Sequence, residues 1–239
     1  MNNINDAIAF VLVGGLGTRL RSVIGDETPK PLALIDGEPF LKLLLHWLEK
    51  QGIRHVVLGT GYLAEKFEEE ITSYAPAGMT IQFSREEKPL GTGGAIRNAA
   101  NLLGSDPFFV LNGDSIVNAN LCGLMAFHHQ KQAKVTLSLA PVPDASRFGT
   151  VVKDELGRIV AYKEKTGEPI PGEINAGIYV VSQEFLRGLP DQEVFSFEKD
   201  VLSHIDENPS YAMTFNSEFI DIGTPESYCQ ASDFFKRFL

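Results

Sequence analysis

The feature that most constrains the fold is a short apolar run that ends in a glycine-rich turn. Residues Ala7–Val13 are almost wholly apolar, which is typical of a strand buried on both faces of a parallel sheet. Parallel strands need crossover connections, and a helical pattern follows three of the four apolar runs in the first half. This half therefore predicts alternating strands and helices. The expected strands are Ala7–Val13, His55–Gly59, Met79–Phe83 and Pro107–Leu111, and the expected helices are Pro39–Gln51, Leu63–Tyr74 and Thr92–Leu103.

The second half has a different order of elements, in which β-rich runs are separated by turns. Strands are expected at Val135–Ala140, Gly149–Val152, Ile159–Lys163, Ile174–Val181 and Phe219–Ile222, and helices at Phe197–Ile205 and Pro225–Phe235. The fold class is therefore α/β: a Rossmann-like, doubly wound, mostly parallel sheet with a smaller mixed or antiparallel lobe. Because no repeat or long linker separates the halves, we expect a single domain over residues 1–239. Its lobes would lie at about 1–133 and about 134–239.

The charge balance restricts the partners. With 31 acidic and 21 basic residues the net charge is −10, whereas a binder of nucleic acids or membrane surfaces would want a basic face. The polar N-terminus lacks the regions of a signal peptide, and no apolar run approaches the roughly 20 residues of a membrane span. Cys122 and Cys229 lie in no CxxC pair and are expected to be buried, reduced thiols. These observations predict a cytoplasmic protein.

The glycine turn itself, Gly14–Arg19, is suited to gripping a polyphosphate. Backbone N–H groups approach phosphate oxygens most closely where side chains are absent. Arg19, together with Lys30 between two prolines, would add the positive charge that an anionic displacement centre needs. The P-loop string GxxxxGK[ST] does not occur, and the dinucleotide fingerprint GxGxxG lacks its third glycine because Leu20 follows Arg19. A turn that merely connects strand and helix is the alternative, but it leaves Thr18, Arg19 and Lys30 together unexplained.

Six ordered motifs carry a family resemblance. The segment Val11–Pro31 (VLVGGLGTRLRSVIGDETPKP) resembles the signature of sugar-1-phosphate nucleotidyltransferases, also called nucleotide-sugar pyrophosphorylases. The further matching segments are Pro89–Ala95 (PLGTGGA), Leu111–Asp114 (LNGD), Glu164-Lys165, Asn175–Tyr179 (NAGIY) and Phe219–Pro225 (FIDIGTP). The resemblance implies the nucleotide-diphospho-sugar transferase fold, and transfer of a nucleotidyl group from an NTP to a sugar 1-phosphate with release of pyrophosphate. One departure is Val13, which stands where the family usually has alanine and bears on the choice of nucleotide.

The resemblance also implies a magnesium site built from two distant aspartates. Asp114 follows an expected strand at its carboxyl end, where open α/β sheets bind ligands, although a helix N-cap is the alternative from the residues alone. Asp221 is uninformative by itself. In the family the matching aspartates hold Mg²⁺ jointly, and we carry that role to Asp114 and Asp221. The acceptor phosphate is already ionised, so the implied catalytic groups are Arg19, Lys30 and Asp114 rather than a nucleophile and a base.

The remaining site residues concern the two substrates. By resemblance, the nucleotide contacts are Leu12, Gly14, Gly15, Gly17, Thr18, Arg19 and Gly91, and the sugar-phosphate contacts are Gly149, Glu164, Lys165 and Asn175. Glu86, five residues before Gly91, adds a candidate contact to the base. A carboxylate accepts both N–H donors on the pairing edge of guanine, whereas uracil or thymine offers one; a solvated surface charge is the alternative for Glu86. GTP is therefore the favoured nucleotide.

Several alternatives stay open. Chain length and the segments Pro89–Ile96, Phe195–Glu198 and Phe219–Gly223 look closest to D-glycero-D-manno-heptose 1-phosphate guanylyltransferases, which make GDP-heptose for surface polysaccharides such as lipopolysaccharide or capsule. Mannose-1-phosphate guanylyltransferase and N-acetylmuramate-1-phosphate uridylyltransferase are the alternative activities. A non-catalytic regulatory subunit of the same fold would be expected to have lost some of the charged site residues, all of which are present. His128-His129 resembles a metal pair, but adjacent residues on a helix face different ways, so solvated or partly buried histidines are favoured there. A homo-oligomer is left open.

Overall fold

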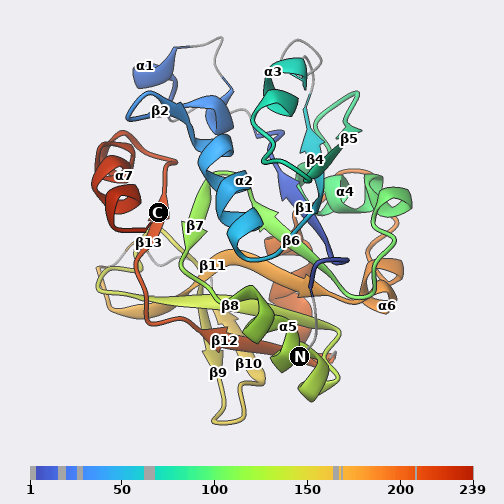
Figure 1. The fold of residues 1–239 in the computed structure, drawn as a ribbon. Helices are drawn as coiled ribbons and strands as arrows, with labels where there is room; N and C mark the ends of the chain where they lie inside the picture. The colour runs from blue at the N-terminus through green and yellow to red at the C-terminus, as the bar shows by residue number, and fades with distance from the viewer. Residues whose placement is uncertain are drawn as a thin grey trace.

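The computed structural model describes residues 4–15, 20–25, 29–61, 68–163, 167, 169–207 and 209–238. Its centre is a nine-stranded mixed sheet (Figure 1). Four parallel strands form one side of this sheet in the order β6 (Phe108–Asn112), β1 (Ile8–Leu12), β4 (His55–Thr60) and β5 (Thr80–Arg85). All four expected strands of the first half are present, and the predicted parallel arrangement is confirmed.

The strands of the second half continue the same sheet. β11 (Gly172–Val181) runs antiparallel to β6 and to β8 (Val135–Val142), and β12 (Ser210–Thr214) lies parallel to β8. The hairpin of β9 (Thr150–Lys153) and β10 (Ile159–Lys163) extends from β11. The mixed character predicted for this half is therefore confirmed.

Helices cover both faces of the sheet, because alternate residues of the buried strands point to opposite sides. In β1, Ala9 and Val11 face one apolar core, whereas Phe10 faces the other. The first core is completed by α2 (Phe40–Lys50), α5 (Leu121–Lys131) and α7 (Pro225–Phe238), and the second by α4 (Gly91–Asn98), α6 (Gln183–Arg187) and the helical segment Phe197–Val201. The short helices α1 (Arg21–Ile24) and α3 (Glu68–Ser73) complete the arrangement.

Two small sheets lie outside the large one. β2 (Leu34–Ile35) pairs with β3 (Glu38–Pro39), and β7 (Ser115–Val117) pairs antiparallel with β13 (Phe219–Asp221). The second pairing sets Asp221 opposite Ser115, next to Asp114, and so closes a loop of more than a hundred residues. This pairing positions the site described below.

Several boundaries differ from the sequence predictions. The helix expected at Thr92–Leu103 breaks after Asn98 and continues as a 3₁₀ turn, and the helix expected at Phe197–Ile205 is one π turn followed by 3₁₀ turns. Of the helix expected at Leu63–Tyr74, residues 62–67 lie outside the described part of the chain. The strands β7 and β12 and the helices α5 and α6 are additions that the sequence patterns did not predict.

The cysteine prediction needs a correction. Neither Cys122 nor Cys229 is in a disulfide, as expected, but both are exposed rather than buried because they lie on the outward faces of α5 and α7. His128, by contrast, is buried, and one ring nitrogen lies 2.9 Å from the hydroxyl of Thr136, in keeping with a structural role.

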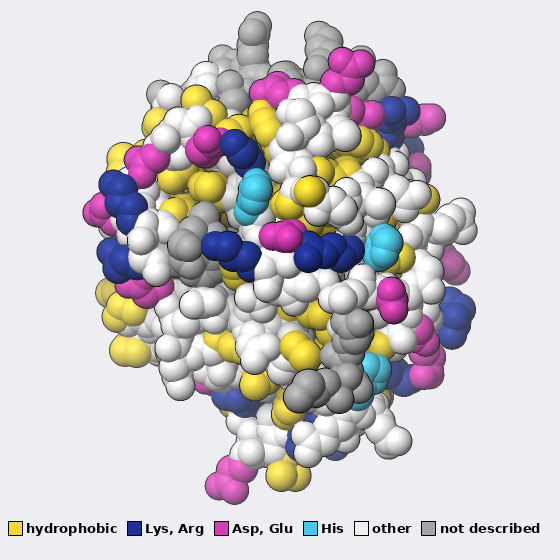
Figure 2. All heavy atoms as spheres, viewed as in Figure 1, with side chains coloured by type: hydrophobic (Ala, Val, Ile, Leu, Met, Phe, Trp, Pro, Cys, Tyr) yellow, Lys and Arg dark blue, Asp and Glu magenta, His cyan; other side chains and the backbone are white. Residues whose placement is uncertain are grey.

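On the face seen in Figure 2, the coloured acidic and basic side chains are interspersed rather than gathered by sign. Among the described residues, no helix combines the length and apolar character needed to cross a bilayer.

Candidate active site

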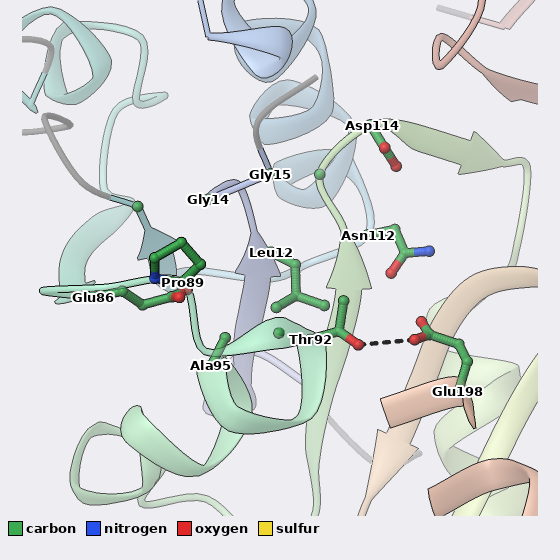
Figure 3. Close-up of a pocket in the computed structure, with 13 residues that line it drawn as sticks. Leu12, Gly14, Gly15, Glu86, Pro89, Thr92, Ala95, Asn112, Asp114 and Glu198 are labelled. Carbon is green, nitrogen blue, oxygen red and sulfur yellow. Dashed lines mark hydrogen bonds between the residues drawn. The ribbon is translucent and has the colours of Figure 1, made fainter. Parts of the chain in front are cut away.

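A cavity of about 340 Å³ opens at the carboxyl ends of the parallel strands. Its walls come from five regions: the turn after β1, the turn after β4, the loop leading into α4, the turn after β6, and the segment Phe197–Val201 (Figure 3). The lining residues are Leu12, Gly14, Gly15, Gly61, Glu86, Pro89, Gly91, Thr92, Ala95, Asn112, Gly113, Asp114 and Glu198. Six residues predicted from the sequence are among them: Leu12, Gly14, Gly15, Glu86, Gly91 and Asp114.

The glycines of the first turn allow close backbone approach. A Cβ on Gly14 would lie 3.0 Å from the backbone nitrogen of Gly61 and 3.2 Å from the Glu86 carboxylate. A side chain at Gly14 would therefore crowd this wall of the cavity. The rest of the predicted turn, Gly17, Thr18 and Arg19, lies outside the described residues.

Lys30 joins the two aspartates that the sequence places far apart. Its Nζ lies 2.5 Å from Asp114 Oδ2 and 3.6 Å from Asp221 Oδ1. The 3₁₀ helix Lys30–Leu32 buries this lysine, and the β7–β13 pairing supplies Asp221. The carboxylates of Asp114 and Asp221 therefore face the same ammonium group.

The electrostatics of Asp221 reflect a crowded anionic site. Burial raises the pKa of its carboxyl above the ordinary value, and the charge of Asp114 raises it further, whereas Lys30 opposes the shift. Asp221 Oδ1 also accepts a hydrogen bond from the backbone N–H of Gly223 at 2.7 Å, and Arg147 Nη2 lies 3.7 Å from Oδ2. An added cation between the carboxylates would therefore relieve repulsion.

Two carboxylates are a small ligand set for a metal. Within the described ranges, no group of three or more His, Cys, Asp or Glu side chains is placed to hold a metal ion. Mg²⁺ is commonly bound by one or two carboxylates together with substrate phosphates and water, so Asp114 and Asp221 fit that ion as donors. A Cβ on Gly223 would lie 2.7 Å from Asp221 Oδ1 and 2.9 Å from Lys30 Nζ, so the glycine keeps the space around these groups open.

Glu86 stands at one end of the cavity. Its Oε2 accepts a hydrogen bond from the backbone N–H of Leu90 at 2.9 Å, which fixes the carboxylate against the loop before α4. Burial raises the pKa of Glu86, and the Leu90 N–H opposes this shift. Glu86 is therefore a partly buried carboxylate of the cavity wall. Gly91, with φ of +73°, has a backbone conformation that favours glycine, and a Cβ there would lie 2.5 Å from the carbonyl oxygen of Phe195.

Asn175 and Gly149, predicted on the sugar side, lie together. The backbone N–H of Asn175 donates to the carbonyl oxygen of Gly149 at 3.5 Å. The side-chain amide of Asn175 donates to the Tyr179 hydroxyl at 2.7 Å and accepts from the Gly177 N–H at 3.1 Å. Among the described residues, one N–H and one lone pair of that amide thus have no further partner. Glu164 and Lys165 lie outside the described residues.

Among the polar residues of the cavity wall that the sequence reasoning missed are Thr92 and Glu198. Both lie in segments that carried the resemblance, Pro89–Ile96 and Phe195–Glu198, but no pattern in either segment singles out one side chain. Thr92 Oγ1 donates to Glu198 Oε2 at 2.8 Å, so a contact between residues more than a hundred positions apart was the missing signal (Figure 3).

Comparisons with known proteins agree with this geometry. A family model described as nucleotidyl transferase matches residues 8–237. A mannose-1-phosphate guanylyltransferase of Mycobacterium tuberculosis is 40% identical over 94% of this chain, which spans 63% of the length of that enzyme. The D-glycero-alpha-D-manno-heptose 1-phosphate guanylyltransferase of Aneurinibacillus thermoaerophilus is 39% identical over 93% of this chain and 96% of its own.

Among solved structures, HddC from Yersinia pseudotuberculosis, determined in complex with GMP-PN, superposes with a TM-score of 0.85 at 34% identity. The match covers 96% of this chain and 99% of that one. It confirms the predicted fold class, and the relatives confirm the resemblance drawn from the six motifs. By motif, architecture and overall similarity, this chain belongs to the nucleotidyl transferase family.

Proposed function

We propose that the chain is a sugar-1-phosphate guanylyltransferase that joins GTP to D-glycero-D-manno-heptose 1-phosphate and releases pyrophosphate. The observation that carries the reaction class is the meeting of Lys30, Asp114 and Asp221 beside a cavity lined by a glycine turn. A regulatory subunit that only binds a nucleotide would have no need for this buried charge cluster. The relatives whose full length this chain matches are named for guanylyl transfer to the heptose phosphate.

The chemistry needs positioning and charge rather than a nucleophilic side chain. Asp114 and Asp221 would hold Mg²⁺, which when bound supplies positive charge to the α-phosphate and the departing pyrophosphate. Lys30 keeps the two carboxylates together, and Arg19 is assigned to the phosphates of the nucleotide. Lys165 is assigned to the phosphate of the acceptor, whose ionised oxygen attacks the α-phosphorus in line.

The preference for guanine rests on Glu86. Its carboxylate is held by Leu90 at the end of the cavity, where a base inserted beside Leu12 and Pro89 would present its pairing edge. Guanine offers two N–H donors to one carboxylate, and each hydrogen bond to a charged group contributes about 1.5–3 kcal/mol. Uracil and thymine offer one donor and two carbonyl oxygens, which the carboxylate would repel.

The sugar is the less constrained part of the proposal. Mannose 1-phosphate is the second candidate, because the mycobacterial mannose enzyme is as similar in sequence as the heptose enzymes. A cytoplasmic role in supplying GDP-heptose for surface polysaccharides is part of the same proposal.

The test is a matrix of four NTPs against a panel of sugar 1-phosphates, scored by pyrophosphate release. The panel includes the heptose, mannose, glucose and N-acetylmuramate phosphates, and the Asp114→Asn protein serves as the control for contaminating activity. We expect GTP with the heptose phosphate to give the highest kcat/KM, and chelation by EDTA to abolish activity until Mg²⁺ is restored. Highest activity with UTP would contradict the role of Glu86, and no pyrophosphate from any pair would contradict the reaction class.

A further inference from the structure

A third carboxylate, Glu198, lies on the cavity wall with Glu86 and Asp114 and has no assigned role. It belongs to the helical segment Phe197–Val201, far along the chain from the glycine turn. In Figure 3 Glu198 and Glu86 lie on opposite sides of the cavity, with Leu12 between them and Asp114 at a third corner. Glu198 is thus well separated from the side chain that we assign to the base.

The hydrogen bonds of Glu198 leave one oxygen largely available. Its Oε2 accepts from the hydroxyls of Thr92 at 2.8 Å and Ser196 at 3.2 Å, which uses both lone pairs of that oxygen. From the residues that the structure describes, its Oε1 receives only the long contact from the Tyr179 hydroxyl at 3.5 Å. Glu198, a residue of the cavity wall, therefore keeps a lone pair on Oε1 that no described residue fills.

The network around Glu198 has a fixed direction. The Asn175 amide donates to the hydroxyl of Tyr179, and that hydroxyl donates onward to Glu198. Tyr179 is fully buried, and burial together with the charge of Glu198 raises its pKa well above the ordinary value, so the phenol keeps its proton as a donor. Thr92 Oγ1, which accepts from the Phe197 N–H, likewise points its own hydrogen at Glu198. Glu198 is the terminal acceptor of this chain of donors.

The negative charge of Glu198 determines which chemical groups of a ligand can bind next to it. In the described part of the chain, none of the ion pairs within 4.0 Å involves Glu198, so no neighbouring cation neutralises it there. A phosphate next to this carboxylate would be repelled, whereas a neutral group rich in O–H donors would be held. The hydroxyls of a sugar ring have that chemistry.

We propose that Glu198 accepts hydrogen bonds from ring hydroxyls of the acceptor sugar and so determines which sugar 1-phosphate is used. The inference deepens the function proposed above and rests on it. The acceptor is favoured over the ribose because the network of Glu198 leads to Asn175, which pairs with Gly149 on the antiparallel side of the sheet. Thr92, in the first turn of α4, links this acceptor to the loop at the base end of the cavity.

The test compares wild type with Glu198→Gln, which keeps the shape of the side chain and one acceptor oxygen. Initial rates are measured with the heptose and mannose 1-phosphates and with their singly deoxygenated analogues. We expect E198Q to raise the KM for the sugar phosphate about tenfold or more while the KM for GTP stays within about twofold. One of the deoxygenated analogues should lack the hydroxyl that Glu198 binds. For wild type, kcat/KM with that analogue should be about tenfold lower than with the complete sugar phosphate, whereas for E198Q the two values should be nearly equal.

The control is Glu184→Gln, an exposed carboxylate on α6 that pairs with Lys134 outside the cavity. It should leave both KM values unchanged. If Glu198 only supports the positions of Thr92 and the Phe197–Val201 segment, E198Q will lower Tm. Each deoxygenated analogue will then lower kcat/KM by the same factor in wild type and in E198Q, and this result overturns the inference. A rise in the KM for GTP alone would instead place Glu198 at the ribose and also overturns it. An inactive wild type would overturn the proposed function, whereas an active wild type whose E198Q variant keeps its KM would overturn this inference alone.

Discussion

Replacing Lys30 by methionine tests whether one ammonium group holds the two aspartates of the site together. Lys30 Nζ contacts Asp114 Oδ2 at 2.5 Å and Asp221 Oδ1 at 3.6 Å, and the lysine side chain is only 10% exposed. Methionine preserves most of the apolar stem but removes the charge. Two carboxylates would then face each other without the cation between them.

The expected loss of stability follows from the burial of the three groups. Removing one partner of a fully buried ion pair costs about 3–5 kcal/mol. The Asp114 side chain is 39% exposed, so water screens part of the repulsion, and we expect the free energy of unfolding to fall by about 2–3 kcal/mol. For a domain of this size each kcal/mol lowers Tm by about 2–4 °C, which corresponds to a drop of about 4–12 °C.

Lys42→Met is the matched control. Lys42 pairs with Glu38 at 2.6 Å, a similar separation, but on an exposed helix surface, so the change should stay within about 0.5 kcal/mol. Unfolding in urea can be followed by the fluorescence of Trp47, the single tryptophan, whose side chain is buried. Pyrophosphate release by K30M should fall at least about a hundredfold.

The pH dependence adds a second check. Burial and Asp114 already raise the pKa of Asp221, and Lys30 opposes them, so K30M should raise that pKa further. A carboxyl whose pKa is higher in the folded than in the unfolded state stabilises the fold at low pH and loses that contribution as pH rises through the folded value. The deficit of K30M should therefore be largest near neutral pH and shrink toward about pH 4. A deficit no larger than that of K42M, or one that is constant with pH, would refute the reasoning.

Three further predictions concern other groups. Asp114→Asn and Asp221→Asn should each lower kcat about a hundredfold or more and weaken Mn²⁺ binding in titration calorimetry; near-normal rates would exclude the shared metal site. Glu86→Gln should reduce the ratio of kcat/KM for GTP over UTP by about tenfold or more, and an unchanged ratio would remove this residue from base recognition. Burial lowers the pKa of His128 to about 4, so its contribution to stability is complete above about pH 6.5 and is lost as pH falls toward 4. Urea unfolding of His128→Gln, compared with wild type at pH 7 and pH 5, should show a smaller acid dependence, and an identical dependence would contradict the assignment.

The parallel half of the fold was predictable because its signals are local. A run such as Ala7–Val13 is apolar at nearly every position, and only a strand covered on both faces accounts for it. The short strand β7 gave no such signal. Ser115–Val117 directly follows the turn after β6, and its pairing with Phe219–Asp221 depends on a partner more than a hundred residues away. Period and propensity report on neighbours in sequence, so they do not reveal this pairing.

The residues of the candidate site likewise divide into those that local sequence signals reveal and those that only the folded structure reveals. Asp114 and Glu86 were singled out because each stands near a strand end or a glycine loop, and Lys30 because it lies between two prolines after the glycine turn. The structure brings Asp114 and Lys30 into contact. Glu198 was not singled out, since a glutamate in a helical segment with one lysine beside it reads as solvated surface. Its role depends on Thr92 and Tyr179, which reach it from separate elements. The direction of the hydrogen bonds to Glu198 is set only when the separate elements assemble into the cavity wall, so no single segment of the sequence reveals it.

The motif Asn175–Tyr179 shows how one stretch of sequence serves both the fold and the site. β11 runs antiparallel to β6, so its residues near Asn175 lie beside the carboxyl end of β6, where the turn carrying Asp114 begins. Gly177 has φ of +75°, and a Cβ there would lie 2.7 Å from Nδ2 of Asn112. The pairing of β11 with β8 shifts register at this point, between Asn175 and Tyr179. Across this irregularity the Asn175 amide donates a hydrogen bond to the Tyr179 hydroxyl at 2.7 Å. A glycine that looks like part of a ligand-binding signature is therefore required by the close packing of two strands, and the amide of Asn175 is the part of the motif that we propose for the sugar.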